Sequence, residues 1–510
     1  MALRIPKIKQ SRVQTASLPA PTAGWNTKDS YASMDSHYAP VISDWWPQPS
    51  YVELRKGYTQ WATGFPSNVN SVMGYTPSSG TAKLFGAAGS GIYDATATGA
   101  ISSAVVTGLT SNKFQHVEFS TAGGHFLVAC NGSDSVYNYD GSSWTNPSIT
   151  GVTSANLVSV DAHKNRLWFV EKNSTSAWYL GTKSISGAAS QFDLGSVFNG
   201  GGYLQAIGTW TLDAGYGLDD YCVFVSSTGQ VAVYQGTDPS SSTTWSLIGV
   251  YQVGQPIGYR CLKKYGGDLL IMCMNGVFPL SRALQSTTIN LQSALSYNIQ
   301  QAISTATSEY SSNFGWEMAV YPLANMLIVN VPVTTTTGQQ QYVMNTLHGA
   351  WTNFTNWPAN SFAVWDNQLW FGGDDFIAKA WNGYQDGSAS ISADVIQAYS
   401  YFGQNTALKR FTMTRPIFTT SGSPSISMRV NTDFDFSEPS AILTFSPSSY
   451  GVWDTSTWDS AIWGGSDNIK KNWQGSNAIG YAAAAHFEVQ SNVSVKWMST
   501  DYVYELGSVL

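Results

Sequence analysis

The sequence predicts an all-β protein: a β-propeller of six or seven blades with one inserted helix, and a small β-rich platform domain formed by the N- and C-terminal segments. Three observations support this class. The 510 residues are 14% aromatic but only 11% charged, and 47 of them are glycine. Short strands joined by tight turns have this composition, whereas long helices need more Lys, Glu and Leu. In addition, an aromatic motif recurs along the chain, and neither end of the chain follows it.

The recurring unit is an alternating apolar strand, a turn with Gly or Asn, and a second strand with an aromatic end. Successive aromatic ends lie 39 to 64 residues apart, and four of the six spacings are between 39 and 44. A period near this length, with four short strands per unit, is typical of propeller blades. The longer spacings indicate insertions. The aromatic ends are Tyr93, Tyr137, Tyr179, Tyr234, Phe278, Tyr342 and Trp381.

The pattern predicts three segments. Residues 1–62 form an extended segment that joins the platform domain, because prolines there favour extended chain. Residues 63–388 form the propeller, with a helical insertion near 284–307 where Leu291, Leu295 and Ile299 recur at helical spacing. Residues 389–510 read as alternating strands of the C-terminal platform domain.

Several classes of protein are not indicated. The basic, polar N-terminus shows no secretory signal, and the longest apolar run, Leu269–Met274, is too short for a membrane-spanning helix. The net charge of −7 argues against a protein that is wrapped by nucleic acid with high affinity. One basic cluster is either a solvated tail or a nucleic-acid-binding arm: Arg4, Lys7, Lys9 and Arg12.

The four cysteines form no Cys-x-x-Cys pair, and each lies in an apolar run typical of a strand. We therefore expect buried, reduced thiols rather than a zinc site or disulfides, which suits folding in a cytosol. They are Cys130, Cys222, Cys261 and Cys273.

No catalytic signature is present: the sequence has no nucleophile elbow, no His-Glu-x-x-His and no phosphate-binding Gly-Lys-Ser/Thr loop. We expect no catalytic, cofactor-binding or metal-binding residues and no cofactor. The acidic pairs Asp219-Asp220 and Asp374-Asp375 fit solvated turns better than the facing carboxylates of a glycosidase. The single box Asn138–Trp144 departs from the sialidase pattern. The histidines are scattered singly: His37, His116, His125, His163, His348 and His486.

Three tryptophans recur at a spacing of five, which matches neither a helix nor one face of a strand. They either fill separate apolar holes from a coiled loop or form an aromatic platform that binds sugars. They are Trp453, Trp458 and Trp463.

Four stretches of the sequence resemble the nozzle protein of short-tailed phages (tail tubular protein B) and the related hub or DNA-stabilisation proteins of podoviruses. They are Gly24-Trp-Asn-Thr with Met34–Ala39, Trp45-Trp46-Pro47 and Tyr51–Gly57; Gly276–Ser281 with the helix that follows; Met344–Thr352 with Leu369–Gly373; and Lys409–Phe411 with Asn431–Asp435 and the Trp-Asp series at 453–465.

This resemblance implies a structural virion protein without catalytic residues, assembled in the host cytoplasm. Its copies would form a ring, of six subunits, below the tail adaptor ring, with tail fibres or tailspikes attached nearby. Genomic DNA would leave through the axial channel without sequence-specific binding. Because a phosphate-binding wall would retain DNA, we expect the channel wall to be depleted of Lys and Arg.

Two other classes stay open on the residues alone. One is a carbohydrate-binding, lectin-like propeller with Trp-rich loops, and the other is a propeller glycoside hydrolase.

Overall fold

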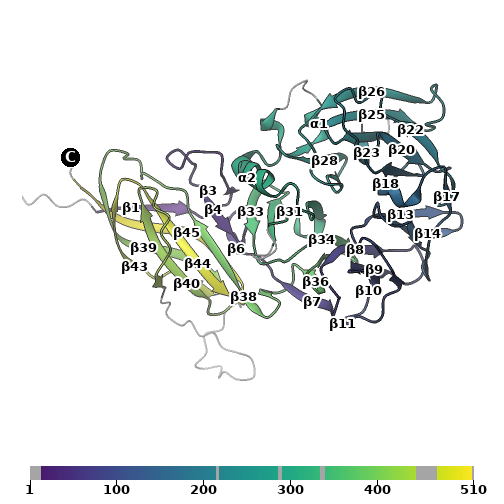
Figure 1. The fold of residues 1–510 in the computed structure, drawn as a ribbon. Helices are drawn as coiled ribbons and strands as arrows, with labels where there is room; N and C mark the ends of the chain where they lie inside the picture. The colour runs from purple at the N-terminus through teal and green to yellow at the C-terminus, as the bar shows by residue number, and fades with distance from the viewer. Residues whose placement is uncertain (1–12, 214–217, 285–289, 334–338, 444–467, 508–510) are drawn as a thin grey trace, which may run out of the picture. The chain divides into compact units, whose positions relative to one another are not determined.

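A computed structural model of the chain describes residues 13–213, 218–284, 290–333, 339–443 and 468–507. The chain divides into two compact units. The propeller unit contains residues 58–347 and 354–382, and the platform unit contains residues 1–57, 348–353 and 383–510. Figure 1 shows both as assemblies of strands.

In the propeller unit, antiparallel strands that follow one another in the chain form five separate sheets. Two parallel two-residue strands, β17 (Ile149–Thr150) and β21 (Gly187–Ala188), and a 3-10 turn, η1 (Ser154–Asn156), accompany them. The five sheets are β8 (Val69–Tyr75), β9 (Lys83–Ala88), β10 (Gly91–Asp94) and β12 (Val106–Thr107); β13 (Gln115–Thr121), β14 (Gly124–Cys130), β15 (Tyr137–Tyr139) and β16 (Trp144–Thr145); β18 (Leu157–His163), β19 (Arg166–Glu171), β20 (Ser176–Tyr179) and β22 (Ser190–Asp193); β23 (Leu204–Asp213), β24 (Leu218–Ser226), β25 (Gln230–Gly236) and β26 (Trp245–Gln252); and β27 (Leu262–Tyr265), β28 (Asp268–Cys273) and β29 (Gly276–Pro279).

Two further groups of antiparallel strands complete this unit, but they belong to one larger network of paired strands. Only five of the strand groups are separate sheets. Counted in this way, the propeller has five blades, fewer than the six or seven predicted. The first group is β30 (Glu317–Tyr321), β31 (Met326–Val331) and β32 (Gln340–Asn345), with the turn η4 (Pro322–Ala324). The second is β34 (Ser361–Trp365), β35 (Gln368–Gly372), β36 (Phe376–Ala380) and β7 (Tyr58–Thr63), which also pairs with β11 (Gly99–Ala100).

The first strands of the seven groups contact one another in a closed ring: β8, β13, β18, β23, β27, β30, β34 and again β8. Strand β7, from the beginning of the chain, closes the last group by pairing with β36. This arrangement confirms the propeller class (Figure 1). It also moves the predicted boundary, because residues 58–62 lie in β7 and hence in the propeller rather than in the N-terminal segment.

Buried apolar side chains fill the space between successive sheets of the propeller. One cluster joins the β8 and β13 sheets through residues such as Phe85 and Leu127. Another packs β7, β35 and β36 against the β8 sheet through Trp370 and Ile377. The aromatic ends found in the sequence lie in the third strand of six groups, and Trp381 directly follows the third strand of the seventh.

The helical insertion differs from the prediction near 284–307. The described residues form a short helix α1 (Leu280–Ala283), 3-10 turns η2 (Leu291–Ser293) and η3 (Tyr297–Ile299), and the helix α2 (Gln300–Tyr310). The Asn290 side chain accepts a hydrogen bond from the Gln292 N–H at 3.0 Å, which favours a tight turn where the apolar spacing predicted helix. Helix α2 buries Ile303, Ala306 and Thr307.

The platform unit is built from both ends of the chain, as the sequence predicts. Strand β1 (Val13–Pro19) pairs along its whole length with β45 (Val495–Leu506), which also pairs with β39 (Lys409–Thr420). A second layer contains β38 (Ala389–Ile396), β44 (Ala483–Ser491) and β40 (Ser425–Thr432). The shorter strands are β2 (Gly24–Trp25), β3 (Tyr38–Ala39), β4 (Val41–Ser43), β5 (Trp45–Pro47), β6 (Val52–Leu54), β37 (Gln385–Asp386), β41 (Ala441–Ile442), β42 (Asn468–Lys470) and β43 (Gln474–Gly480).

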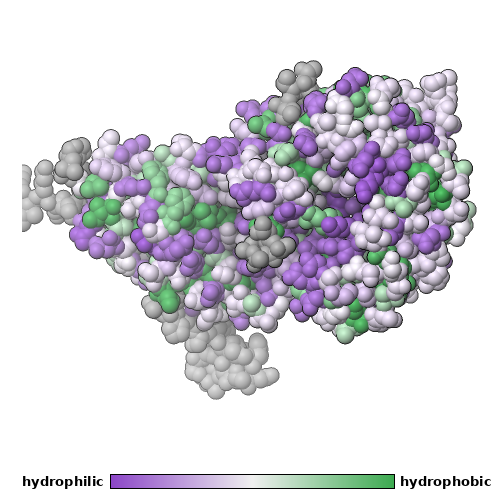
Figure 2. Space-filling model, viewed as in Figure 1, coloured by the Kyte–Doolittle hydropathy of each residue, from purple (hydrophilic) through white to green (hydrophobic). Residues whose placement is uncertain are grey.

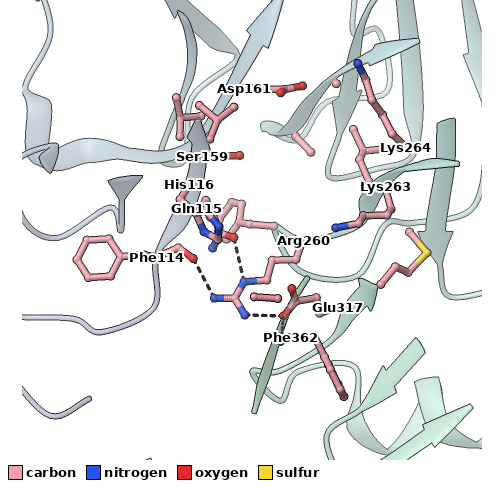
Figure 3. Close-up of a pocket in the computed structure, with 18 of the residues that line it drawn as sticks. Phe114, Gln115, His116, Ser159, Asp161, Arg260, Lys263, Lys264, Glu317 and Phe362 are labelled. Atoms are coloured by element: carbon pink, nitrogen blue, oxygen red, sulfur yellow. Dashed lines mark hydrogen bonds and ion pairs between the residues drawn. The ribbon is translucent and has the colours of Figure 1, made fainter. Parts of the chain in front are cut away.

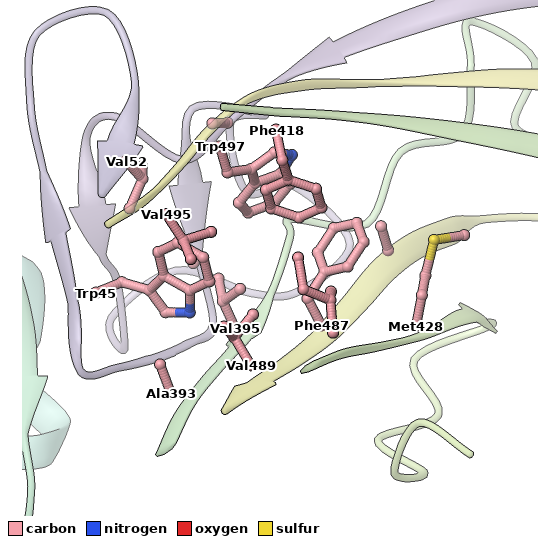
Figure 4. Packing of buried hydrophobic residues seen from close by; sticks show 14 of the residues in the cluster. Trp45, Val52, Ala393, Val395, Phe418, Met428, Phe487, Val489, Val495 and Trp497 are labelled. Atoms are coloured by element: carbon pink, nitrogen blue, oxygen red, sulfur yellow. The ribbon is translucent and has the colours of Figure 1, made fainter. Parts of the chain in front are cut away.

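One aromatic core lies between these layers (Figure 4). The Phe487 and Trp497 ring centroids are 4.9 Å apart, and Trp45 packs on Trp497 at 6.4 Å. Strand β33 (Ala350–Phe354) was not expected here, because its sequence lies inside the predicted propeller range. Its residues 350–353 belong to the platform, where Trp351 pairs with Gly24. A Cβ on Gly24 would lie 2.3 Å from the Trp351 carbonyl oxygen, so this close approach requires glycine.

The four cysteines are buried and form no disulfide, as predicted. All four lie in the propeller unit. No helix among the described residues is long and apolar enough to cross a membrane. Hydrophilic side chains cover much of the visible face of the propeller unit in Figure 2.

Candidate functional site: the central cavity of the propeller

The candidate site is a cavity of about 500 Å³ that runs along the centre of the propeller unit. Its wall comes from the first strand of each of the seven groups, and from the residues Tyr259 and Arg260 that precede β27. Consecutive residues of these inner strands line the cavity, such as Gln115, His116, Val117 and Glu118 of β13. The ring closure described above therefore creates the site.

A single guanidinium spans one end of this cavity (Figure 3). Arg260 reaches residues at the start of β8, β13 and β30, so it ties together three groups besides its own. All five hydrogen bonds have ordinary lengths, and a charged donor makes them stronger than neutral ones. The acceptors are Gln115 Oε1 (3.0 Å), Glu317 Oε2 (2.9 Å), Ser71 Oγ (3.0 Å) and the carbonyl oxygens of Asn70 (3.0 Å) and Phe114 (2.9 Å).

Glu317 extends this connection to a fifth group. Its Oε2 atom also accepts a hydrogen bond from the Phe362 N–H of β34 at 3.2 Å. The Arg260 guanidinium lies 5.1 Å from the centroid of the Phe314 ring, and the Lys113 ammonium lies 4.5 Å from it. Arg260 is thus held by an ion pair, neutral acceptors and an aromatic ring at this end of the cavity.

Farther along the cavity, His116 and Asp161 have displaced pKa values. Enclosure by protein, together with the positive charges of Arg260 and Lys263, lowers the pKa of His116 to about 3, so the ring is neutral at pH 7. Burial raises the pKa of Asp161 to about 6, although its hydrogen bond from the Ala162 N–H and the charge of Lys264 oppose this shift. The His116 side chain remains accessible from the cavity.

This arrangement is suited to holding polar or charged groups. Glu118 accepts a hydrogen bond from the Thr76 N–H and lies 3.6 Å from His125 Nε2. Among the described residues, no three His, Cys, Asp or Glu side chains come together as metal ligands would. A cavity of about 500 Å³ has the size of a small-molecule site rather than of a channel for duplex DNA.

The structure keeps the six histidines apart. His163 Nδ1 lies 3.1 Å from Thr209 Oγ1, and burial lowers the pKa of His163 to about 4. His486 is buried in the platform beside Asp394. His37 contacts Asp35, His125 contacts Ser120, His348 contacts the Thr22 carbonyl, and His116 lines the cavity.

The acidic residues singled out in the sequence lie in turns or strand ends. Asp220 accepts a hydrogen bond from Thr211 at 2.7 Å and pairs with Lys164 at 3.3 Å. Asp374 and Asp375 are exposed next to Gly373. Asp140 accepts hydrogen bonds from Ser142 and Ser143 of its own turn. The Asp219 side chain and the Trp series at 453–465 lie outside the described residues.

Sequence reasoning did not identify Arg260. Its partners lie 57 to 190 residues away, and no local motif marks an arginine that will bond across a ring of strands. The recurring aromatic motif indicated a propeller, whose strands surround a centre, but it did not indicate which side chains line that centre.

No protein-family model and no curated protein matches the chain. Among solved structures, BBS1N in complex with ARL6DN, soaked with mercury, is 13% identical at a TM-score of 0.37, over 64% of this chain and 97% of that one. YCF48 bound to D1 peptide is 11% identical at a TM-score of 0.36, over 69% of this chain and 99% of that one. The propeller class rests on the strand pairing described above rather than on these distant similarities.

Proposed function

We propose that the protein is a non-enzymatic structural component of a short phage tail, the nozzle. Its copies form a ring, of six subunits, around an axial channel through which genomic DNA leaves. The ring attaches to the adaptor ring of the tail and carries fibres or tailspikes. The proposal starts from the four stretches of resemblance and is supported by the way the chain builds its two units.

The observation that carries the proposal is the insertion of the propeller into the platform. The chain passes between the two units four times, at 57/58, 347/348, 353/354 and 382/383. Each unit is also closed by strands from distant parts of the chain, β1 with β45 and β7 with β36. Two stiff β units joined by four covalent connections suit a part that transmits mechanical load, because load is shared among the connections.

The stretches that resemble the nozzle family have structural roles in this chain. Lys409 is buried, and its ammonium donates to the carbonyl oxygens of Gln404 (2.6 Å), Ala407 (3.0 Å) and Tyr481 (2.8 Å). Asp433 accepts hydrogen bonds from the N–H groups of Tyr481 (2.7 Å) and Ala482 (3.0 Å). Such residues set the path of the backbone, which agrees with a role that needs no reactive centre.

The DNA channel of this proposal lies between subunits, because the cavity inside each propeller has a volume of only about 500 Å³ and Arg260 spans one end of it. Six copies carry six times −7, or −42, formal charges. An acidic or neutral wall repels phosphates and lets the duplex slide, whereas a lysine-rich wall would hold it through counterion release. We expect few Lys and Arg side chains on the ring's inner wall.

Native mass spectrometry of the full chain, together with negative-stain imaging, tests the proposal. We expect rings whose mass is six times 55.2 kDa, in solution or on addition of the adaptor ring. A monomer that stays monomeric with the adaptor and binds a glycan array would favour a lectin. Sugar release that is lost when one loop Asp is changed to Asn would favour a glycosidase. Either result would overturn the nozzle role.

A further inference from the structure

The end of the central cavity next to Arg260 offers hydrogen-bond donors, while one carboxylate oxygen of Glu317 and the amide oxygen of Gln115 already accept hydrogen bonds. Glu317 Oε2 accepts from both Arg260 and the Phe362 N–H. Gln115 Oε1 accepts from Arg260, which directs the Gln115 amide N–H groups elsewhere. The Ser159 hydroxyl and the His116 ring line the same space.

Lys263 adds a positive charge to this region. Figure 3 shows its ammonium directed into the cavity from the side opposite His116 and Ser159. Among the residues that the structure describes, Lys263 has no carboxylate within ion-pair distance. Lys264 differs, because Asp161 lies near enough for its carboxylate to respond to the Lys264 charge. Lys263 is exposed within the cavity, so its ammonium can donate charged hydrogen bonds to an anion that enters the cavity.

We propose that this part of the cavity binds a small molecule through a carboxylate or phosphate group, which lies between the Lys263 ammonium and the His116 ring. The Gln115 amide and the Ser159 hydroxyl supply further donors, and the Arg260–Glu317 pair forms the floor. The cavity volume of about 500 Å³ lies within the range of small-molecule sites. This binding site does not depend on the tail role.

Binding has a consequence that a purely structural lysine would not produce. The pKa of His116 is low because the ring is enclosed and because Arg260 and Lys263 repel a further positive charge. A bound anion offsets that repulsion, so the pKa of His116 rises. The His116 signal in NMR spectra of the ¹³C-histidine-labelled protein reports this change directly.

The experiment titrates the full chain with inorganic phosphate and, separately, with citrate, while sodium chloride keeps the ionic strength constant. Calorimetry measures affinity, and NMR follows His116. The test variant is Lys263→Met, which removes the charge and keeps much of the side-chain volume. The matched control is Lys172→Met, which removes a charge from an exposed lysine in the β19–β20 turn. Melting curves establish that both variants fold.

We expect saturable binding of at least one probe to the wild type and to Lys172→Met, weakened about ten-fold or more in Lys263→Met, as loss of a charged hydrogen bond predicts. Tighter phosphate than citrate binding assigns a phosphate group, and the reverse assigns a carboxylate. If neither probe binds the wild type, or if Lys263→Met binds equally well, the proposal is wrong. Should Lys263→Met fail to fold, an unchanged His116 pKa in the saturated wild type overturns it as well.

Discussion

Each of the two units contains a buried or nearly buried arginine that connects distant strands, Arg55 in the platform and Arg260 in the propeller, but the charges of these two arginines are compensated differently. Arg55 of the platform is fully buried and bonds to two carboxylates, Asp44 and Asp386. Arg260 of the propeller keeps 12% of its side chain exposed to the cavity and bonds to one carboxylate and four neutral acceptors.

This difference follows from the two cores. The platform packs an aromatic core between its layers, and Arg55 is fully buried in this unit, so its charge must be compensated completely. Burial alone would lower the pKa of Arg55, but Asp44 and Asp386 outweigh that effect and raise it. The propeller instead divides its core into clusters between sheets and leaves a polar space at the centre, where an arginine retains some water. Removing the polar contacts of Arg55 in the platform therefore lowers the free energy of unfolding more than removing those of Arg260 in the propeller.

The largest effect is expected for Arg55→Met. This change leaves Asp44 and Asp386 buried without their cation, which typically costs about 3–5 kcal/mol. Hydrogen exchange should rise in peptides from 41–57 and 383–396, while the four thiols, which all lie in the propeller, stay protected.

The neutral triple variant Arg55→Met, Asp44→Asn, Asp386→Asn is the control for this prediction. Because it removes all three charges, it should recover much of the lost stability. If the single and triple variants are equally unstable, packing rather than charge explains the role of Arg55.

A smaller effect is expected for Arg260→Met. The lost bonds involve a charged donor, so we expect a cost of about 2–3 kcal/mol confined to the propeller. Thiol labelling of Cys130, Cys222, Cys261 and Cys273 under mild denaturant should accelerate, whereas Arg282→Met, at an exposed position of α1, should leave it unchanged. Equal labelling of both variants would mean that Arg260 does not hold the ring.

The third expected effect is a dependence of stability on pH in the platform unit. Burial disfavours charge on His486, but hydrogen bonds to Asp394 (2.8 Å) and to the Ser437 carbonyl, with Glu438 nearby, outweigh it and raise the pKa of His486. Burial, Glu438 and Asp394 also raise the pKa of Glu488. Both groups bind protons more tightly when folded, so platform stability is present below their unfolded pKa values and declines as pH rises.

We expect the platform to lose the stability contributed by His486 between about pH 6.5 and the folded pKa of His486. The stability contributed by Glu488 is lost at lower pH, above about pH 4.3. Melting curves from pH 5 to 8.5, followed by exchange in peptides of β38 and β44, measure it. His486→Gln should cost about 1–2 kcal/mol below pH 6.5 and flatten the dependence. A platform that becomes more stable as pH rises would contradict this assignment.

The smallest effect is expected for Lys83→Met. Lys83 pairs with Asp94 at 2.7 Å, but both side chains are more than a quarter exposed. Such pairs contribute about 0–1 kcal/mol, so neither melting nor thiol labelling should change measurably. A larger loss would show that partly exposed pairs matter more to the propeller than the comparison with Arg55 suggests.

Local patterns in the sequence were sufficient for the repeat. Tyr93, Tyr137, Tyr179 and Tyr234 lie in the third strands of successive sheets because a strand's face and its turns depend on neighbouring residues. The helix prediction near 284–307 was less accurate, since apolar spacing does not reveal that Asn290 initiates a 3-10 turn.

By itself, the sequence determined the strand-rich class, the propeller repeat, the burial of the cysteines and the joining of both chain ends in one β unit, because alternation and turn chemistry are local. Tertiary structure alone decided that Asp386 meets Arg55 across 331 residues and that Arg260 spans the cavity. It also placed residues 350–353 in the platform. Such pairings depend on which strands become neighbours, and alternation specifies the face of a side chain but not its partner.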